Sequence, residues 1–160
     1  MRDSFHDDLD GIGASLVEMG HLVNKAMERA TTALLTADLK VAEEIISEDD
    51  AIDDMQHDIE ARAINLMARQ QPVAGDLRTL VTSLRMSADL ERMGDLAHHV
   101  AKLTRMRYPA AAVPPELVLT LQEMGNVTAR IAQKAIGVIE SRNLEAALQL
   151  EKDDDEMDIL

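Results

Sequence analysis

The chain has 160 residues, enough for one ordinary domain with a sizeable hydrophobic core, and its formal net charge at pH 7 is −14. So acidic a surface repels the phosphate backbone of nucleic acids and suits basic partners or multivalent cations. The absence of cysteine excludes disulfides, thiolate metal sites and cysteine nucleophiles.

Residues 1–10 are polar and acidic, and no apolar run approaches the roughly 18 residues that would cross a membrane. We therefore expect a cytoplasmic protein with neither a signal peptide nor a membrane anchor of its own. One Phe, one Tyr, no Trp and few Gly or Pro favour helices over a β-sandwich or barrel.

A first long helix is predicted to begin at an N-cap formed by Asp3 or Ser4 and to end near residue 37. Apolar residues recur along it every three or four positions over several heptads, which is typical of a helix with one buried seam. That seam contains Leu9, Ile12, Leu16, Met19, Val23, Ala26, Ala30 and Ala33.

A second helix is predicted from its N-cap Asp38 to about residue 69. Its main apolar face carries Ile45, Ile52 and Ile59, and an adjoining stripe carries Ala42, Ile46, Ile64 and Met67. Three acids, Asp49, Asp53 and Glu60, lie within that adjoining stripe. Because Asp53 follows Ile46 by seven residues, the two side chains project in nearly the same direction. We expect Asp49 and Asp53 to turn towards the core.

A third helix is predicted to run to about residue 107, after a connection at residues 70–76 in which Pro72 suits the first helical turn. Glu91 and Asp95 are four residues apart on it, so they lie one turn apart on one face. At helical spacing the same face carries the apolar residues Leu77, Val81, Leu84 and Ala88. Burying unpaired carboxylates costs several kcal/mol each, so this pair must protonate, pair with bases or hold a cation.

The segment from Tyr108-Pro109 to Pro114-Pro115 is a clear break, which predicts a linker at residues 109–114. The three helices before it have similar lengths and can pack as an up-down-up bundle over residues 1–108. Another helix is predicted from about Pro115 to Arg142. Asn143 can cap a last one, which is still running at Leu160.

The last third of the sequence repeats the first third at a displacement of 105 residues, without a gap. Leu16, Glu18, Met19 and Gly20 align with Leu121, Glu123, Met124 and Gly125, and Asp49, Asp50 and Asp53 align with Asp154, Asp155 and Asp158. The repeat unit is about three helices, and the second unit, residues 115–160, holds its first helix and part of its second. This predicts an all-α fold with one complete and one incomplete bundle. We therefore expect a part of a longer two-bundle protein that self-associates.

Two segments resemble the PhoU family, the phosphate-transport and phosphate-signalling accessory proteins of bacteria. They are Arg69-Gln70-Gln71-Pro72-Val73-Ala74-Gly75-Asp76-Leu77-Arg78 and Asp89-Leu90-Glu91-Arg92-Met93-Gly94-Asp95. The family is similar in having Q-P-x-A-x-D-L-R at the start of the third helix and L-E-R-x-G-D within it. The resemblance covers essentially the whole chain and implies a fold of tandem three-helix bundles.

The resemblance also implies a metal centre, because the family carries an E(D)-x-x-x-D motif on the second and third helix of each bundle. By this likeness the motif falls on Asp49 and Asp53, on Glu91 and Asp95, and, in the second repeat, on Asp154 and Asp158. The implied cofactors are one or several divalent or trivalent metal ions. Iron, zinc, magnesium and manganese all accept carboxylate oxygens.

Other uses of these acids remain open from the residues themselves. Exposed acidic faces are common, and the bases Arg62, Arg78, Arg92 and Lys102 are available as partners, so a metal-free helical adaptor is one alternative. The other is a ferritin-like di-iron carboxylate protein, because Glu18 and His21 match its Glu-x-x-His spacing. Asn126 stands where His21 would recur, so that pattern is not sustained. His98 and His99 lie a turn beyond Asp95, and His57 lies four residues after Asp53, so each could add a ligand. We interpret all three as surface or boundary residues.

No nucleophile–base constellation and no Gly-rich phosphate loop occurs, so we expect no enzymatic activity. The resemblance implies a cytoplasmic negative regulator of the phosphate-starvation response. It would couple the high-affinity phosphate ABC transporter to a sensor histidine kinase. The expected partners are the transporter's ATPase subunit, the kinase and a second copy of this chain in a homodimer, with the membrane reached only through partners.

Overall fold

A computed structural model of the chain describes the backbone of residues 2–160 and the side chains of residues 4–160. Every regular element in this range is helical, which confirms the all-α prediction. The elements are α1 (Arg2–Thr36), α2 (Leu39–Glu48), α3 (Asp50–Gln70), α4 (Ala74–Arg107), the short 3₁₀ helix η1 (Pro115–Leu117), α5 (Val118–Ser141) and α6 (Leu144–Ile159).

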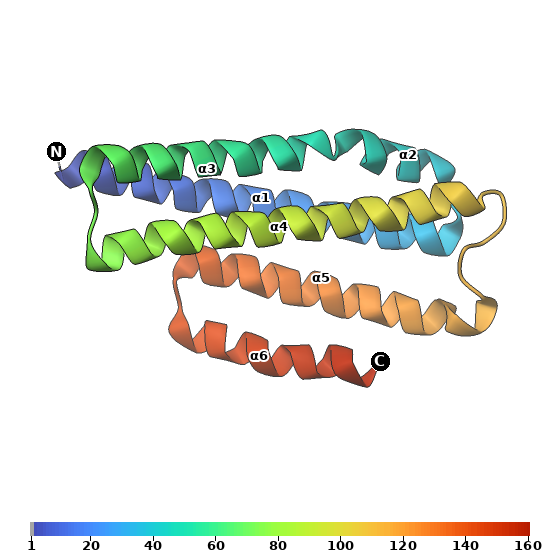
Figure 1. The fold of residues 1–160 in the computed structure, drawn as a ribbon. Helices are drawn as coiled ribbons and strands as arrows, with labels where there is room; N and C mark the ends of the chain where they lie inside the picture. Colours follow the sequence, from blue (N-terminus) through green and yellow to red (C-terminus); the bar gives the residue numbers. More distant parts are fainter. Residues whose placement is uncertain (1) are drawn as a thin grey trace.

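The helices lie side by side in alternating directions (Figure 1). α1 is the centre of the arrangement, because it packs against α2, α3, α4 and α5. α2 and α3 together form one side of a three-helix bundle with α1 and α4, whereas α5 runs antiparallel along another face of α1. α6 is outermost and, among the described residues, packs on α5. No described helix is both long and apolar enough to span a bilayer.

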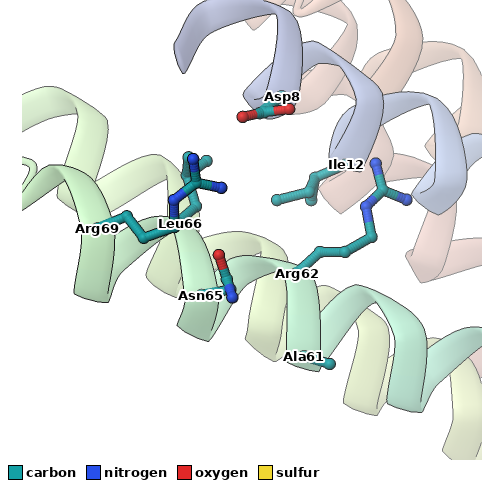
Figure 2. Close-up of a pocket in the computed structure, with 7 residues that line it drawn as sticks. All are labelled: Asp8, Ile12, Ala61, Arg62, Asn65, Leu66 and Arg69. Carbon is teal, nitrogen blue, oxygen red and sulfur yellow. The ribbon is translucent and has the colours of Figure 1, made fainter. Parts of the chain in front are cut away.

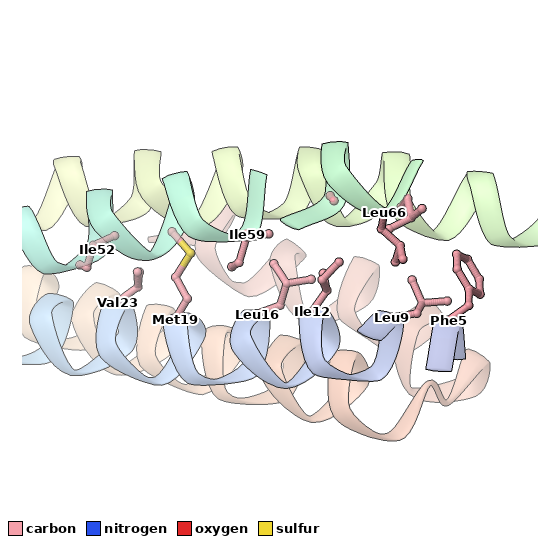
Figure 3. Packing of buried hydrophobic residues seen from close by; sticks show 11 residues of the cluster. Phe5, Leu9, Ile12, Leu16, Met19, Val23, Ile52, Ile59 and Leu66 are labelled. Atoms are coloured by element: carbon pink, nitrogen blue, oxygen red, sulfur yellow. The ribbon is translucent and has the colours of Figure 1, made fainter. Parts of the chain in front are cut away.

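The predicted seam of α1 forms the core of the bundle. Leu9, Ile12, Leu16, Met19 and Val23 are buried and face Ile52, Ile59 and Leu66 of α3 (Figure 3). Further along, Ala30 and Ala33 are fully buried in a second cluster with α2 and α4, and Ala26 is partly buried against it. The predicted start of the helix is wrong: α1 is already helical at Arg2, so neither Asp3 nor Ser4 is its N-cap.

The second predicted helix is divided at Asp49 into α2 and α3. Asp38 caps it as expected, since its side chain accepts a hydrogen bond from the Val41 backbone N–H. At Asp49 the backbone keeps helical dihedrals, but the Asp53 N–H to Asp49 carbonyl bond stretches to 3.5 Å and the Ile52 N–H bonds the same carbonyl at 3.0 Å. The helical path therefore continues while its hydrogen-bond ladder is interrupted.

The main apolar face of this divided helix is confirmed, because Ile45, Ile52 and Ile59 are buried. The adjoining stripe is only partly right: Ile64 is half exposed and Glu60 is exposed. The reason is that α3 buries a single narrow seam, which contains Ile52, Ile59, Ala63 and Leu66. Residues beside that seam turn outward.

The connection before α4 differs from the prediction at Pro72. Gln71 takes a left-handed conformation and its N–H bonds the Met67 carbonyl, which ends α3. Val73, in an extended conformation, is the N-cap of α4, so Pro72 lies in the connection and not in the first helical turn.

The predicted apolar stripe of α4 is not its buried face, because Leu77, Val81 and Ala88 are exposed. Small residues fill the buried face instead, and they include Ser83, Ser87, Gly94, Ala97, Ala101 and Thr104 beside Leu80. Small side chains let α4 approach α1 and α3 closely. Glu91 and Asp95 therefore stand at the edge of a small-residue contact and do not continue a buried apolar row.

The internal repeat holds in the backbone and in the ion pairs. Ala37 and Arg142, which are equivalent in the repeat, both have left-handed φ, of 51° and 54°. The next residues, Asp38 and Asn143, both cap the following helix. The ion pair from Arg29 to Glu48 recurs 105 positions later, from Lys134 to Asp153.

Candidate metal centre

Four carboxylates meet beside the contact between α3 and α4. Asp49 lies at the α2–α3 junction and Asp53 one turn further along α3, while Glu91 and Asp95 lie one turn apart on α4. All four are half-buried. The helices approach closely here because Gly94 has no side chain: a β-carbon on it would lie 2.9 Å from Cδ1 of Ile52. The structure thus brings together the two acid pairs that the sequence singled out.

The electrostatics of this group reflect its crowding. Burial raises the pKa of the Asp53 carboxyl, and the charges of Asp49 and Asp95 raise it further. Burial likewise raises the pKa of the Glu91 carboxyl, reinforced by the charges of Asp95, Asp53 and Asp49 and by a hydrogen bond with Asp95. Each pair therefore feels the opposite pair across the helix contact. A bound cation would offset this mutual repulsion.

No arginine or lysine compensates these acids among the described side chains. Arg62, one of the bases considered from the sequence, pairs with Asp58 at 3.2 Å and donates to the Ser15 hydroxyl at 2.8 Å instead. Arg92, on the same helix as Glu91 and Asp95, is exposed. Neutralisation by Lys or Arg therefore does not account for the cluster.

A histidine joins the group on the side of Asp49. Nδ1 of His98 contacts Oδ2 of Asp49 directly, and both side chains are mostly buried. One ligand atom each from Asp49, Asp95 and His98 can be chosen so that all three lie within 4.8 Å of one another. His98 Nε2 is buried and has no hydrogen-bond partner. His98 is partly buried, which agrees with a boundary position, and its contact with Asp49 makes it a candidate added ligand. His57 and His99 are exposed, as expected.

The remaining predicted ligands, Asp154 and Asp158, are exposed on α6 and lie outside this cluster. α6 packs on α5, and the acids that pair with that helix are Asp153, which binds Lys134 at 2.7 Å, and Glu156, which binds Arg130. In the first repeat, α4 supplies the second acid pair. Residues 2–160 contain no equivalent of α4 for the second repeat, so no second pair is brought to Asp154 and Asp158.

The pattern expected of a di-iron carboxylate protein does not face the bundle interior. Glu18 and His21 are both exposed on α1, whereas such sites need side chains that project inward from facing helices. Asn126, which replaces the histidine in the second repeat, is also exposed and donates to Glu123. The structure therefore gives no support to a ferritin-like centre at these residues.

A cleft of about 360 Å³ opens between α1 and α3, towards the far end of α3 from the acid cluster (Figure 2). Arg62 and Arg69 extend from α3 towards α1, with Asp8 opposite them. Arg62 is already held by Asp58 and Ser15. One of the two arginines of this cleft is thus already occupied, and the acid cluster remains the stronger candidate site.

The donor set of the acid cluster fits a metal ion. Four carboxylates supply hard oxygen ligands, which suit magnesium, manganese, calcium and iron. One imidazole beside them adds the nitrogen donor that zinc and other transition metals accept. The ligands come from two elements, so a bound cation would also tie the α2–α3 junction to α4.

Comparison with known proteins places the chain in a family. The sequence pattern of the PhoU domain matches residues 16–104. The phosphate-specific transport system accessory protein PhoU homolog 2 of Mycobacterium tuberculosis is 44% identical over 160 residues, covering 100% of this chain and 75% of the relative. The PhoU homolog of Clostridium acetobutylicum is 36% identical, covering 99% of this chain and 72% of the relative.

Two solved structures share the fold. The crystal structure of PhoU from Pseudomonas aeruginosa has a TM-score of 0.89 at 28% identity, covering 96% of this chain and 73% of that one. The phosphate transport system regulatory protein PhoU from Streptococcus pneumoniae has a TM-score of 0.85 at 27% identity, covering 96% and 72%. With a domain match over more than half of its length and a relative of this similarity, the chain belongs to the PhoU family.

Proposed function

We propose that the chain is a metal-binding negative regulator of the phosphate-starvation response, acting as an accessory protein of a phosphate-specific transport system. The observation that carries this proposal is the convergence of two carboxylate pairs in a chain whose relatives are named as such accessory proteins. The proposal includes no catalytic activity, because the cluster contains no nucleophile with an adjacent base.

The metal centre of this proposal consists of Asp49, Asp53, Glu91 and Asp95, holding one or several divalent or trivalent ions. The raised pKa values of Asp53 and Glu91 support it, because burial first, and then the charges of neighbouring carboxylates, disfavour their ionised forms in the absence of a cation. When bound, the ion would neutralise this repulsion and join α3 to α4. Asp154 and Asp158 are proposed to serve the second repeat in the same way.

The regulatory role depends on how metal binding changes the surface. A cleft of about 290 Å³ lies behind Asp49, lined by Leu22, Ala26, Ile45, Ile52 and Gly94 with Lys25 and Arg29 among its polar residues. Because Asp49 and Gly94 border both the cleft and the acid cluster, fixing the cluster also fixes one wall of the cleft. We propose that metal presents this rigid helical face to a partner.

The proposed partners are the ATPase subunit of the phosphate ABC transporter and the cytoplasmic region of the sensor histidine kinase. The chain would act in the cytoplasm and reach the membrane only through them. We also propose a homodimer, and we divide the chain into a first bundle (residues 1–108), a linker (109–114) and a partial second bundle (115–160). Half-exposed or largely exposed Leu119, Leu144, Leu148 and Ile159 on α5 and α6 support self-association.

The metal part of the proposal is tested by elemental analysis of the purified chain and of Asp95→Asn. Asp89→Asn, an exposed acid on the same helix, is the matched control for the charge change. We expect D95N to lose bound metal and stability together, and D89N to keep both. Unchanged metal stoichiometry in D95N would overturn the site.

The regulatory part is tested by pull-down of the kinase and the ATPase subunit with metal-loaded and chelator-treated protein. We expect binding to fall when metal is removed and to recover when it is returned. Equal capture of the partners by metal-free protein would refute the coupling. Light scattering after size exclusion tests the dimer, which a monomer at all concentrations would exclude.

A further inference from the structure

We propose that His98 is a direct ligand in the acid cluster, so that Asp49, Asp95 and His98 form a subsite for ions that accept imidazole, such as Zn²⁺, Co²⁺ or Fe²⁺. This inference rests on the proposed metal-binding function and names the class of metal that one end of the centre prefers. It predicts that this end discriminates against Mg²⁺ and Ca²⁺, which prefer an all-oxygen shell.

The candidate ligand atoms are close enough together to be shared by one ion. Bonds of about 2.1 Å from a metal to oxygen and nitrogen place its ligand atoms about 3.0 to 4.2 Å apart, depending on the bond angle. The ligand atoms of Asp49, Asp95 and His98 all lie within 4.8 Å of one another. The three groups are therefore gathered near the spacing that an ion needs, and binding would require Nδ1 of His98 and Oδ2 of Asp49, now in direct contact, to move apart.

The second support is the way His98 is held. Its side chain is 15% exposed, and Nδ1 contacts Asp49, so the imidazole is directed to the acid cluster. A histidine kept only for packing is expected to have both ring nitrogens bonded, but Nε2 of His98 is buried without a partner. The residue is thus poorly satisfied as a structural histidine and well placed as a ligand.

The third support is the spacing of the ligands along α4. Asp95 and His98 are three residues apart, so their side chains share one helix face, and Asp49 approaches from the α2–α3 junction. Asp53 and Glu91 lie one turn away on the side opposite to His98. The centre therefore has a mixed nitrogen and oxygen end at His98 and an oxygen-only end at Asp53 and Glu91.

The neighbouring histidine supplies a matched control. His99 is exposed, and its ring stacks against that of His98 with centroids 6.2 Å apart and planes 14° apart. Replacing His99 removes an imidazole from the same helix turn and disturbs the same ring, but it removes no atom of the proposed subsite. An effect that is specific to His98 must therefore arise from its contact with the acids.

The experiment compares the full chain with His98→Asn and His99→Ala, each stripped of metal and titrated separately with Co²⁺, Zn²⁺ and Mg²⁺. For H98N we expect Co²⁺ and Zn²⁺ affinity to fall about tenfold or more, with a changed Co²⁺ absorption spectrum, and Mg²⁺ affinity to change little. H99A should match the unaltered chain. Unchanged Co²⁺ and Zn²⁺ affinity in H98N would overturn the inference. An equal loss for Mg²⁺ would also overturn it, since that result indicates positioning and not ligation.

A second measurement does not depend on how well H98N folds. X-ray absorption at the zinc edge of the unaltered chain and of H99A should show imidazole scattering from the bound ion. An all-oxygen shell in both would refute ligation by His98 while leaving the carboxylate centre in place. Failure of the unaltered chain to bind any of the three metals would instead overturn the proposed function together with this inference.

Discussion

Gly20 of α1 and Gly125 of α5 are equivalent positions of the internal repeat. Gly20 packs against Ile136 of α5, and Gly125 packs against Thr31 of α1. A β-carbon on Gly20 would lie 2.8 Å from Cγ1 of Ile136, and one on Gly125 would lie 2.6 Å from Cγ2 of Thr31. Thr31 and Ile136 are themselves separated by the 105-residue displacement. Because α1 and α5 run antiparallel, the two contacts are related by a local twofold pseudo-symmetry.

Replacing Gly125 with Ala should therefore loosen the contact between the two repeats. Overpacking of a close contact costs about 1 to 3 kcal/mol, which exceeds the roughly 1 kcal/mol that Ala gains over Gly in helix propensity. Gly137→Ala is the control on the same helix, because nothing lies within 4 Å of its added β-carbon. Urea denaturation should show G125A less stable and G137A slightly more stable than the unaltered chain. Equal stability of the two variants would contradict the close contact.

The repeat shows what the sequence could and could not predict about the fold. Helix ends at residues 36–39 and 141–144 were predictable because Asp38 and Asn143 carry the local chemistry of an N-cap. The packing of α5 along α1 was not predictable from periodicity, which says that a face is buried but not against which helix. Gly20 and Gly125 were aligned by the repeat, but only the structure shows that they face each other's helix.

Gly94 should control the distance between the two halves of the acid cluster. In Gly94→Ala the new β-carbon would meet Cδ1 and Cγ2 of Ile52, at 2.9 and 3.2 Å, and would push α4 away from α3. We expect a loss of about 1 to 3 kcal/mol in unfolding free energy and weaker metal binding, measured by denaturation with and without metal. Adding Ile52→Val removes Cδ1 and should restore part of both. A G94A variant that binds metal normally would show that the helix separation does not matter.

Removing the N-cap side chain of Asp38 should destabilise the whole fold, whereas removing that of Asn143 should destabilise one helix only. Asp38→Ala removes the acceptor for the Val41 N–H in the complete bundle and should cost about 0.5 to 2 kcal/mol of global stability. Asn143→Ala removes the same bond to Ala146, but α6 packs only on α5 among the described residues. Hydrogen exchange should therefore show faster exchange confined to α6. Faster exchange in α1 of N143A would contradict this separation.

The acid cluster shows a similar division between what could be predicted and what could not. Asp49, Asp53, Glu91 and Asp95 could be found because i and i+4 spacing aligns each pair on one helix face. His98 follows Asp95 by three residues, a spacing that also shares a face, but the sequence alone favoured a surface or boundary position for it. Its contact with Asp49 depends on how α4 is rotated against the α2–α3 junction. That rotation is set by Gly94 and the other small residues of α4, not by the apolar stripe that the sequence suggested.

Asp53 should make the stability of the metal-free protein depend on pH. Its pKa in the folded chain is raised, by burial first and then by the neighbouring carboxylates, so the folded state binds its proton more tightly than the unfolded state does. Stability is therefore lost as pH rises from about 4, the ordinary pKa of an aspartate, through the higher folded value. In chelator, Asp53→Asn should remove this loss and be more stable than the unaltered chain at pH 7, with the difference shrinking as the pH falls. Asp54→Asn, which changes the charge of the exposed neighbouring acid, is the control and should show no such pH-dependent gain.

In chelator D53N should be the more stable protein at pH 7, but in saturating metal the unaltered chain should be more stable than D53N. An ion that binds the folded state stabilises it in proportion to its affinity, and Asp53 is then a ligand whose charge is compensated. Thermal unfolding should show the unaltered chain gaining more from added metal than D53N, while D54N gains as much as the unaltered chain. The same gain in D53N would mean that the carboxylate at position 53 is not part of the metal centre, and that its raised pKa reflects only burial and neighbouring charges.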